Sequence, residues 1–349
     1  MYLYEVDMDT QPSRAIRHFR SGPGYTMALS VLLAVLIVGL TPNALIAQAK
    51  VGTTGAQFLE LGVSARSMGM ADAFVAVSND VSAVYYNPAG LTSLLGTEVM
   101  ATYVSMPADV GYGFAAVGFP LESVGGVLGF GVSALTSGSI IERTYNRGVD
   151  YPAVPAEGIE GIEGTGRKFA WNDLAVSVSY GRYLTDRFSL GFTVRYIGEF
   201  VHDYSASSWS ADVGTSYNTG YRDFKLAMAI TNFGPDLKFI EKAAPLPINF
   251  KFGGSINVIE SGDHILTLVA EGAHPSDNLE KYNTGMEYLF KDRFALRLGG
   301  RFNYDVDGLT AGAGMRLPYG EDGQISFDYA YQDFGILTEV HRFTLGFAF

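Results

Sequence analysis

Strict alternation of apolar residues with small or polar ones, from Thr97 to the end of the chain, constrains this sequence more than any other feature. In one segment, the residues Phe188, Leu190, Phe192, Val194 and Tyr196 alternate with Ser189, Gly191, Thr193 and Arg195. A period of two residues gives a β-strand one apolar face and one small or polar face. The same pattern recurs at residues 174–181, 294–302 and 325–331. The sequence therefore predicts an all-β fold whose strands separate two different environments.

Strand length and composition favour a membrane barrel over a soluble sandwich. In a sandwich the apolar face points into a core, whereas in a membrane barrel it points at lipid. The expected strands have about 9 to 13 residues, and a bilayer requires about 9 to 11, whereas soluble strands average 5 to 6. The 349 residues include 42 Gly, 23 Phe and 21 Tyr, and only 17% are charged. These values are typical of a transmembrane barrel and exclude a disordered chain.

About fourteen strands are expected. They are placed at residues 97–104, 111–119, 125–135, 171–183, 188–200, 207–217, 225–233, 249–258, 264–274, 281–290, 294–302, 309–317, 324–331 and 342–349. Every second connection is then short, as on the periplasmic side of outer-membrane barrels, and the two longest connections share the opposite side. Residues 97–349 are therefore predicted to form a transmembrane antiparallel β-barrel. The longest connection, 136–170, contains a Gly-rich acidic tract and is expected to be a mobile external loop.

The first 49 residues have the features of a secretory signal peptide. Three arginines precede an apolar run at residues 25–40, and Ala47-Gln48-Ala49 provides a small-x-small cleavage site. The alternative is an uncleaved N-terminal anchor, although this apolar run is short for spanning a bilayer. The sequence has no other apolar run of comparable length, which excludes a polytopic helical membrane protein. The chain has no Cys, which excludes a lipoprotein, thiolate metal sites and cysteine nucleophiles.

Residues 50–96 are expected to fill the barrel. Fourteen strands enclose a lumen wider than side chains alone can fill. The segment 56–95 lacks the two-residue alternation, is rich in small and apolar residues and carries Gly62, Gly69 and Gly90 as breakers. Asn79 and Asp80 are candidate N-caps for a helix over residues 81–86, and Asn87-Pro88-Ala89-Gly90 is a turn or stop signal. We therefore expect an N-terminal, partly helical hatch in the lumen.

Three stretches of this segment carry a recognisable signature. They are residues 57–74, Asn79-Asp80 and residues 85–91, and the positions that define them are Gly62, Ala65, Arg66, Gly69, Asp80, Asn87, Pro88, Ala89, Gly90 and Leu91. In this combination the segment resembles the N-terminal signature of the PorV/PorQ family. That family is similar to the FadL-type long-chain fatty-acid channels, which show a related Asn-Pro-Ala element in their hatch.

The resemblance implies a 14-stranded barrel in the outer membrane of a diderm bacterium. Family members in bacteria with type IX secretion act as shuttle or attachment partners for cargo that bears a C-terminal signal domain. The alternative is a FadL-like channel for uptake or efflux of hydrophobic small molecules. Expected partners are outer-membrane lipid, the barrel assembly machinery, secreted cargo proteins and surface-attachment components. Nucleic acid is not expected, because the net charge is −12.

The last strand ends on an aromatic residue. Phe343, Leu345, Phe347 and Phe349 form its apolar row. A terminal strand of this kind resembles the signal that the outer-membrane assembly machinery recognises.

Charged residues on the polar strand faces are expected to line the lumen. They are Arg195, Lys251, Glu271, Glu287, Arg297, Arg301, Arg316, Asp328 and Arg342. A lining of mixed sign favours internal ion pairs that hold the hatch, and a conduction or ligand-binding role is the alternative. Arg66 of the hatch is expected to pair with Glu271, Glu287 or Asp328.

An enzyme is a third class of function. Catalysis at a barrel rim needs a His together with Ser or carboxylate groups. Beyond the expected signal peptide, the His residues are His202, His264, His274 and His341, and His202 and His274 fall near the predicted external strand ends. We interpret His202 and His274 as solvated loop residues and His264 as a turn residue. We expect a non-enzymatic protein without a cofactor or a metal site.

Overall fold

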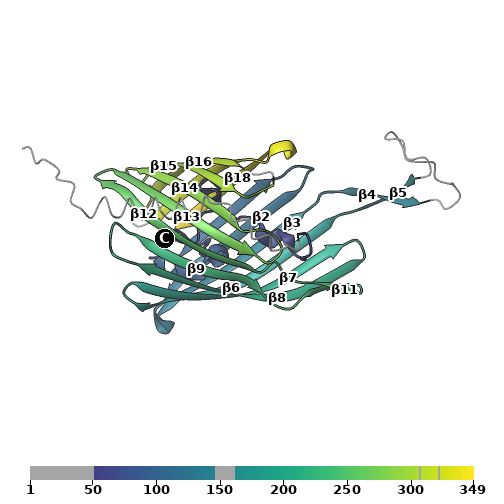
Figure 1. Ribbon diagram of the computed structural model, residues 1–349, viewed down its shortest axis with the longest axis horizontal. Coiled ribbons are helices and arrows are strands. Elements are labelled where there is room, and N and C mark those ends of the chain that lie inside the picture. Colours follow the sequence, from purple (N-terminus) through teal and green to yellow (C-terminus); the bar gives the residue numbers. More distant parts are fainter. Residues whose placement is uncertain (1–50, 146–161, 306–307, 321–322) are drawn as a thin grey trace, which may run out of the picture. The chain divides into compact units, whose positions relative to one another are not determined.

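The computed structural model is a closed antiparallel β-barrel of 14 strands (Figure 1). It describes residues 51–145, 162–305, 308–320 and 323–349, so the predicted signal peptide lies outside the described residues. The barrel strands are β1 (Glu98–Ser105), β2 (Gly111–Leu121), β3 (Gly126–Thr136), β6 (Trp171–Thr185), β7 (Phe188–Val201), β8 (Tyr204–Asn218), β9 (Lys225–Phe233), β12 (Asn249–Ser261), β13 (His264–Pro275), β14 (Lys281–Phe290), β15 (Phe294–Phe302), β16 (Leu309–Tyr319), β17 (Gly323–Asp333) and β18 (Glu339–Ala348). Consecutive barrel strands pair with one another, and β18 pairs with β1. The predicted fold and strand number are confirmed.

The two faces of each strand differ in exposure, as the alternation predicted. In β15, Leu296 and Leu298 are 62% and 53% exposed, whereas Ala295 and Arg297 are only 3% and 2% exposed. The same outward row of large apolar side chains continues around the barrel, for example at Phe192, Val194 and Tyr196 of β7 and at Val176 and Val178 of β6. A water-soluble monomer rarely leaves an apolar surface of this extent uncovered. The outward face is therefore the lipid-facing surface of a transmembrane barrel.

The barrel closes where the first strand meets the last. Glu98 lies opposite Ala348 and Ser105 lies opposite His341. Just before β1, Thr97 exchanges two backbone hydrogen bonds with Phe349, of 2.8 and 2.9 Å. The apolar row that was predicted as the assembly signal lies on the outward face of this seam. Phe343, Leu345 and Phe347 belong to β18, and Phe349 follows it.

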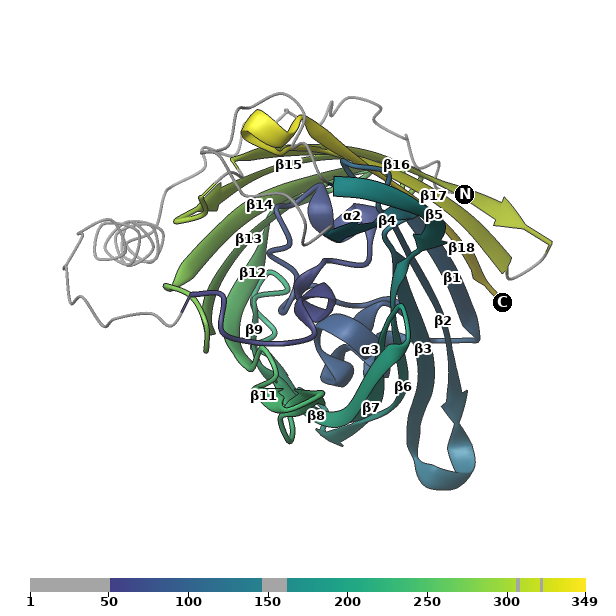
Figure 2. The ribbon, with the colours of Figure 1, turned by 90° about the vertical axis from the view of Figure 1, so that its right-hand side faces the viewer.

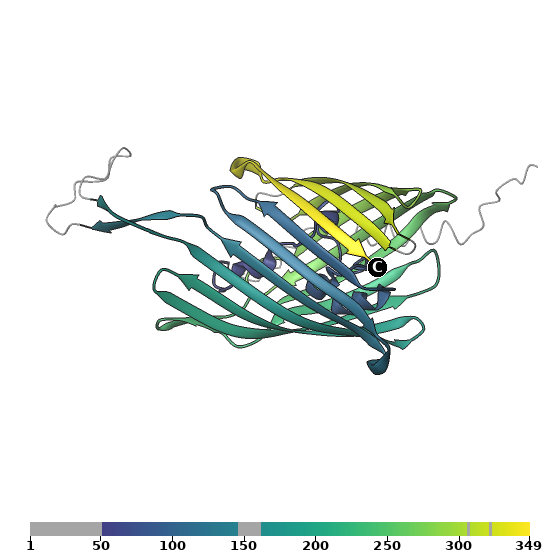
Figure 3. The ribbon, with the colours of Figure 1, turned by 180° about the vertical axis from the view of Figure 1, so that it is seen from behind.

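The two ends of the barrel differ in their connections. At the short-turn end, connections such as 186–187 and 262–263 are tight, and at the long-loop end lie the connections 137–170 and 234–248. Both long connections contain strand pairs, which the sequence did not predict. They are β4 (Ile140–Tyr145) with β5 (Ile162–Phe169), and β10 (Leu237–Phe239) with β11 (Lys242–Ala244). Figures 1 and 3 show that β4 and β5 extend beyond the barrel wall.

The expectation of a loop without strands over residues 136–170 was therefore wrong at both of its ends. Glycines of the predicted low-complexity tract belong to β5, where Gly164 lies opposite Arg143. Strand pairing uses backbone groups, so a Gly-rich segment can join a ladder without the side-chain alternation that marks the other strands. The middle of this connection, residues 146–161, lies outside the described residues.

Residues 56–94 lie inside the ring of strands (Figure 2). Their elements are the 3₁₀ turns η1 (Gln57–Glu60) and η2 (Pro88–Ser93) and the single-turn helices α2 (Ala65–Met68) and α3 (Ala83–Tyr86). Phe74, Val84 and Leu91 of this hatch are fully buried and belong to one apolar cluster with Tyr112 and Phe114 of β2. The hydrophobic core of the protein is thus in the lumen. No helix within the described residues is long and apolar enough to cross a membrane.

The helix predicted over residues 81–86 is shorter than expected, and its expected caps act elsewhere. It begins at Ala83, after Ser82. The Asp80 carboxylate accepts a hydrogen bond from the Ser82 N–H at 3.0 Å and so closes the turn before the helix. The Asn79 side chain accepts a hydrogen bond from the Arg66 guanidinium at 2.6 Å instead. A buried charged donor therefore takes the oxygen that a helix cap would have used.

Glycines in the wall allow the hatch to approach it closely. A Cβ atom at Gly191 of β7 would lie 2.2 Å from the carbonyl carbon of Pro88, and one at Gly214 of β8 would lie 2.0 Å from Asn87 Oδ1. The Asn87 amide also donates to the Thr215 carbonyl oxygen of β8 at 3.1 Å. The Asn-Pro segment of the hatch signature therefore packs on strand positions that have no side chain.

We expect Gly191→Ala to destabilise the folded barrel, because the added methyl group overlaps the hatch backbone and overpacking costs about 1–3 kcal/mol. The measurement is the temperature at which the detergent-solubilised barrel unfolds. Gly113→Ala in β2 is the matched control, because its Cβ would have its nearest neighbour at 4.0 Å. Equal unfolding temperatures for the two variants would contradict this prediction.

Candidate functional site

Arg66 of α2 links the hatch to the wall. Its Nε and Nη2 atoms donate to the two carboxylate oxygens of Glu287 on β14, each at 3.0 Å, and its Nη1 donates to Asp80 at 3.0 Å. Burial alone would lower the pKa of Arg66, but Glu287 and Asp80 outweigh it and raise the pKa. The guanidinium therefore stays charged. Of the three carboxylates that the sequence offered as its partner, the structure selects Glu287.

The ion pair continues along the wall. Arg297 of β15 donates from Nε to Glu287 at 2.6 Å and from Nη1 to Asp328 of β17 at 2.6 Å. Arg316 of β16 interacts electrostatically with both carboxylates. A buried charge is costly unless it is paired and hydrogen-bonded, and this network provides each charge with opposite partners. Four neighbouring strands are thereby joined to one hatch helix.

A second wall carboxylate holds the hatch backbone. Glu271 of β13 accepts hydrogen bonds from the N–H groups of Phe74 and Val75, each at 2.8 Å. Lys251 of β12 lies 3.9 Å from the same carboxylate. These contacts fix the middle of the hatch to β12 and β13, whereas η2 packs on β6, β7 and β8.

The other lumen charges also have partners. Arg195 donates to Asp212 at 2.8 Å, Arg342 lies 3.9 Å from Asp72 of the hatch, and Arg301 lies 4.0 Å from the centre of the Tyr304 ring. Asp72 and Asp212 were not singled out from the sequence. Asp212 has the same strand parity as the lumen-facing Ser210 and Gly214, so the alternation in β8 was the signal that would have identified it.

Replacing Arg66 by Glu should release the hatch, because it places a third carboxylate beside Glu287 and Asp80. Loss of one partner from a buried ion pair costs about 3–5 kcal/mol. We expect a lower unfolding temperature and a larger ion leak in planar bilayers. Arg293→Glu, at an exposed turn, is the matched charge reversal and should change neither quantity. If Arg66→Glu matches the wild-type protein in both measurements, the hatch does not depend on this network.

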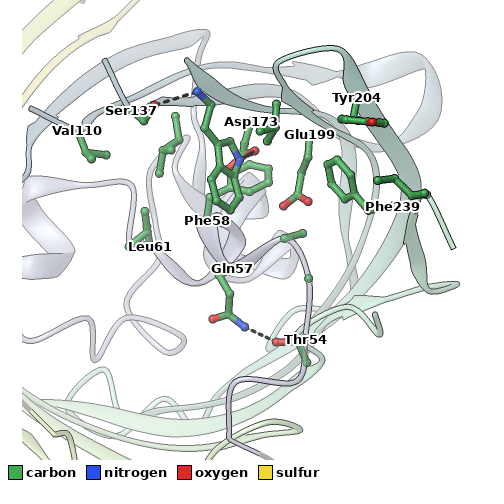
Figure 4. Close-up of a pocket in the computed structure, with 16 residues that line it drawn as sticks. Thr54, Gln57, Phe58, Leu61, Val110, Ser137, Asp173, Glu199, Tyr204 and Phe239 are labelled. Atoms are coloured by element: carbon green, nitrogen blue, oxygen red, sulfur yellow. Dashed lines mark hydrogen bonds between the residues drawn. The ribbon is translucent and has the colours of Figure 1, made fainter. Parts of the chain in front are cut away.

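A cavity of about 600 Å³ lies at the long-loop end, between the hatch and the wall (Figure 4). Its size falls within the range of small-molecule pockets. Its lining is mostly apolar and includes several aromatic side chains. The lining residues are Thr54, Gly55, Ala56, Gln57, Phe58, Leu61, Val110, Leu135, Ser137, Trp171, Asp173, Glu199, Val201, Tyr204, Phe239 and Ile240.

Two carboxylates interrupt the apolar lining. Asp173 of β6 and Glu199 of β7 lie directly opposite each other in the strand register, and each residue is 5% exposed. Asp173 accepts a hydrogen bond from Trp171 Nε1 at 2.5 Å, and Glu199 accepts one from the Ala56 N–H. Sequence reasoning missed this pair, although the parity that placed Arg195 in the lumen also applies to Glu199.

A smaller, polar cavity of about 60 Å³ lies on the other side of η1. Phe58 and Leu61 face the large cavity, whereas Leu59 and Glu60 line the small one. Burial raises the pKa of Glu60, and the nearby Lys281 opposes that shift. The turn at residues 57–61 therefore separates an apolar compartment from a polar one.

The four His residues considered from the sequence have local partners. His202 pairs with its neighbour Asp203 at 2.8 Å, and His274 pairs with Glu280 at 3.3 Å. His264 and His341 lie beside the hydroxyl groups of Tyr288 and Tyr329, at 2.7 and 2.8 Å. The partners of these His residues are thus neighbours in turns and adjacent strands. None of the four residues lines either cavity.

No family model and no curated protein matches this chain. Among solved structures, the toluene transporter TbuX of Ralstonia pickettii is 12% identical, with a TM-score of 0.54 over 82% of this chain and 97% of that one. The CymD monoaromatic hydrocarbon channel is 11% identical, with a TM-score of 0.52 over 82% and 98%. A FadL homologue of Pseudomonas aeruginosa is 12% identical, with a TM-score of 0.50 over 82% and 98%.

At these identities the likeness establishes the fold. The chain shares its barrel architecture with FadL-type hydrocarbon channels, as the sequence resemblance implied. The narrower assignment to the PorV/PorQ family stays a prediction.

Proposed function

We propose that this protein is an outer-membrane channel that admits hydrophobic small molecules through the cavity at its long-loop end. The observation that carries the proposal is the cavity itself, which has about 600 Å³ of space and a mostly apolar lining. Fold neighbours support it, because TbuX is named a toluene transporter and CymD a monoaromatic hydrocarbon channel. Pockets of this size and lining bury most of the surface of a small ligand.

Each segment of the chain has a proposed role in such an outer-membrane channel. Residues 1–49 would direct export, residues 50–96 would act as the hatch and residues 97–349 would span the outer membrane of a diderm bacterium. Short turns face the periplasm in such barrels, so the long-loop end would face outward. Insertion would depend on the assembly machinery recognising the row that ends at Phe349, and membrane lipid would cover the outward apolar belt.

Passage would require the hatch to rearrange. Below the cavity, the lumen is filled by hatch residues that are packed against the wall and tied to Glu271 and Glu287. A hydrocarbon would bind poorly in the polar cavity beyond η1, because it would cover the polar side chains there without forming hydrogen bonds to them. We therefore propose that the cavity is a loading site and that movement of residues 57–61 starts the transfer.

Expression of the protein in a diderm bacterium that lacks hydrocarbon channels should raise the initial rate of toluene uptake several-fold. Whole cells are the appropriate system, since toluene crosses phospholipid liposomes without a protein. Val110→Trp should remove the increase, because the indole would occupy the cavity that Val110 lines. Val124→Trp, in the exposed turn η3 (Glu122–Val124) at the short-turn end, is the matched control. Uptake that is unchanged by the wild-type protein, or equally fast with Val110→Trp, would contradict the proposal.

A second candidate is the shuttle or attachment role in type IX secretion. It is favoured by the hatch signature, from Gly62 to Leu91, and by the β4–β5 hairpin, which extends beyond the wall and offers a surface to a protein partner (Figure 1). Its partners would be secreted cargo with a C-terminal signal domain and surface-attachment components.

Affinity purification from mildly solubilised outer membranes tests this second candidate. Recovery of signal-domain cargo or an attachment enzyme is expected if the shuttle role holds. Replacing residues 140–169 by a short turn should then abolish the recovery, whereas toluene uptake should persist. Bound hydrophobic molecules without any such protein would leave the channel as the function.

A further inference from the structure

The carboxylate pair in the large cavity points to a class of ligand. Five of the six other buried acids each have an Arg or Lys nitrogen within 4.0 Å; they are Asp72, Asp212, Glu271, Glu287 and Asp328. The sixth, Asp277, lies outside the large cavity and accepts hydrogen bonds from the Thr54 hydroxyl and the Gln57 amide. Within the described residues, Asp173 and Glu199 have no Arg or Lys partner. Each accepts one hydrogen bond from a neutral donor, although an ionised carboxylate has about four acceptor positions.

This arrangement is unfavourable without a ligand. Like charges directly opposite each other on one face of an antiparallel pair destabilise the pair, and Asp173 lies opposite Glu199. Both residues are 5% exposed, so water screens their repulsion weakly. A cation between the two carboxylates would offset their repulsion, as Arg66 and Arg297 do for Glu287.

The walls around the pair suit an organic cation. Figure 4 shows Asp173 and Glu199 side by side at the cavity, with Phe58 and Phe239 close to them. Trp171 and Tyr204 also line the space. Aromatic rings attract a cation through the negative face of their π-systems and also bury an apolar body. A hydrated metal ion would gain nothing from these walls, whereas an amine with an aromatic group would use both features.

We infer that the cavity selects aromatic or other apolar molecules that carry a protonated amine, and that it disfavours carboxylates. The ammonium group would lie between Asp173 and Glu199 and donate to their free acceptor positions, while the apolar body would occupy the space lined by Phe58 and Phe239. A fatty acid or an aryl acid would place a third negative charge beside the pair. This inference rests on the proposed channel function and specifies its substrate class.

The chain contains a built-in reporter of binding. Its 2 Trp residues are Trp171, which lines the cavity, and Trp209, which is exposed on the outer wall. In a Trp209→Phe background, the fluorescence of the purified full-length barrel in nonionic detergent reports on Trp171 alone. Three probes of similar shape and different charge are 2-phenylethylammonium, 2-phenylethanol and phenylacetate, titrated at pH 7.

We expect 2-phenylethylammonium to bind about 10- to 100-fold more tightly than phenylacetate, the range that a hydrogen bond between charged groups provides. In Asp173→Asn/Glu199→Gln the amine should lose that advantage, while the affinity for 2-phenylethanol should stay within about twofold. The matched control is Glu260→Gln/Asp263→Asn, which removes the same two charges at exposed positions of the short-turn end and should retain the preference.

Equal binding of the three probes would overturn the selection for amines and leave the channel proposal standing, because the cavity would still accept aromatic molecules. Absence of binding by all three probes would also overturn this inference. The toluene uptake of whole cells then decides the channel proposal separately. Loss of the amine preference in the control variant would show that general surface charge, rather than the pair in the cavity, attracts the amine.

Discussion

Backbone hydrogen bonding inside hydrocarbon is the constraint on which this structure depends. An unpaired N–H or C=O group in the bilayer core costs several kcal/mol, so a sheet that spans a membrane must close on itself. Here β1 meets β18 in register, and Thr97 and Phe349 extend the pairing to the last residue. Closure with 14 strands leaves a wide lumen. The hatch occupies most of that lumen, is held there by ion pairs with the wall and leaves cavities beside it.

The hatch is held by two kinds of contact that act at different places. Near Asn87 and Pro88 it packs on wall glycines, where shape decides the fit. Near Arg66 and Phe74 it is tied by charged groups of the wall, through Glu287 and Glu271. Packing of the first kind tolerates no added atom, whereas the second kind depends on every charge having its partner. The large cavity lies at the long-loop end, where neither kind of contact fills the space. On the hatch side it is lined by residues 54–58 and Leu61.

Charge distribution separates the structural acids from those of the cavity. Glu287 and Asp328 belong to a chain of alternating charges and so contribute to holding the hatch. Asp173 and Glu199 lie among aromatic side chains without a basic partner within the described residues. Buried carboxylates therefore occur in two different surroundings in this protein, and their neighbours distinguish them. In a hydrocarbon-accepting channel, such a pair would add selectivity for charge to selectivity for shape.

The sequence by itself determined the barrel, its approximate strand positions and the two faces of those strands that alternate strictly, because a period of two residues fixes which side chains share a face. It also indicated a hatch in the lumen and placed Arg66 among three possible acidic partners. Only the tertiary structure decided that the partner is Glu287, that Asn79 binds Arg66 instead of capping a helix, and that β4 and β5 form a hairpin. Register and the path of the hatch set these contacts, and both arise from pairing between residues far apart in the chain, which local patterns do not encode.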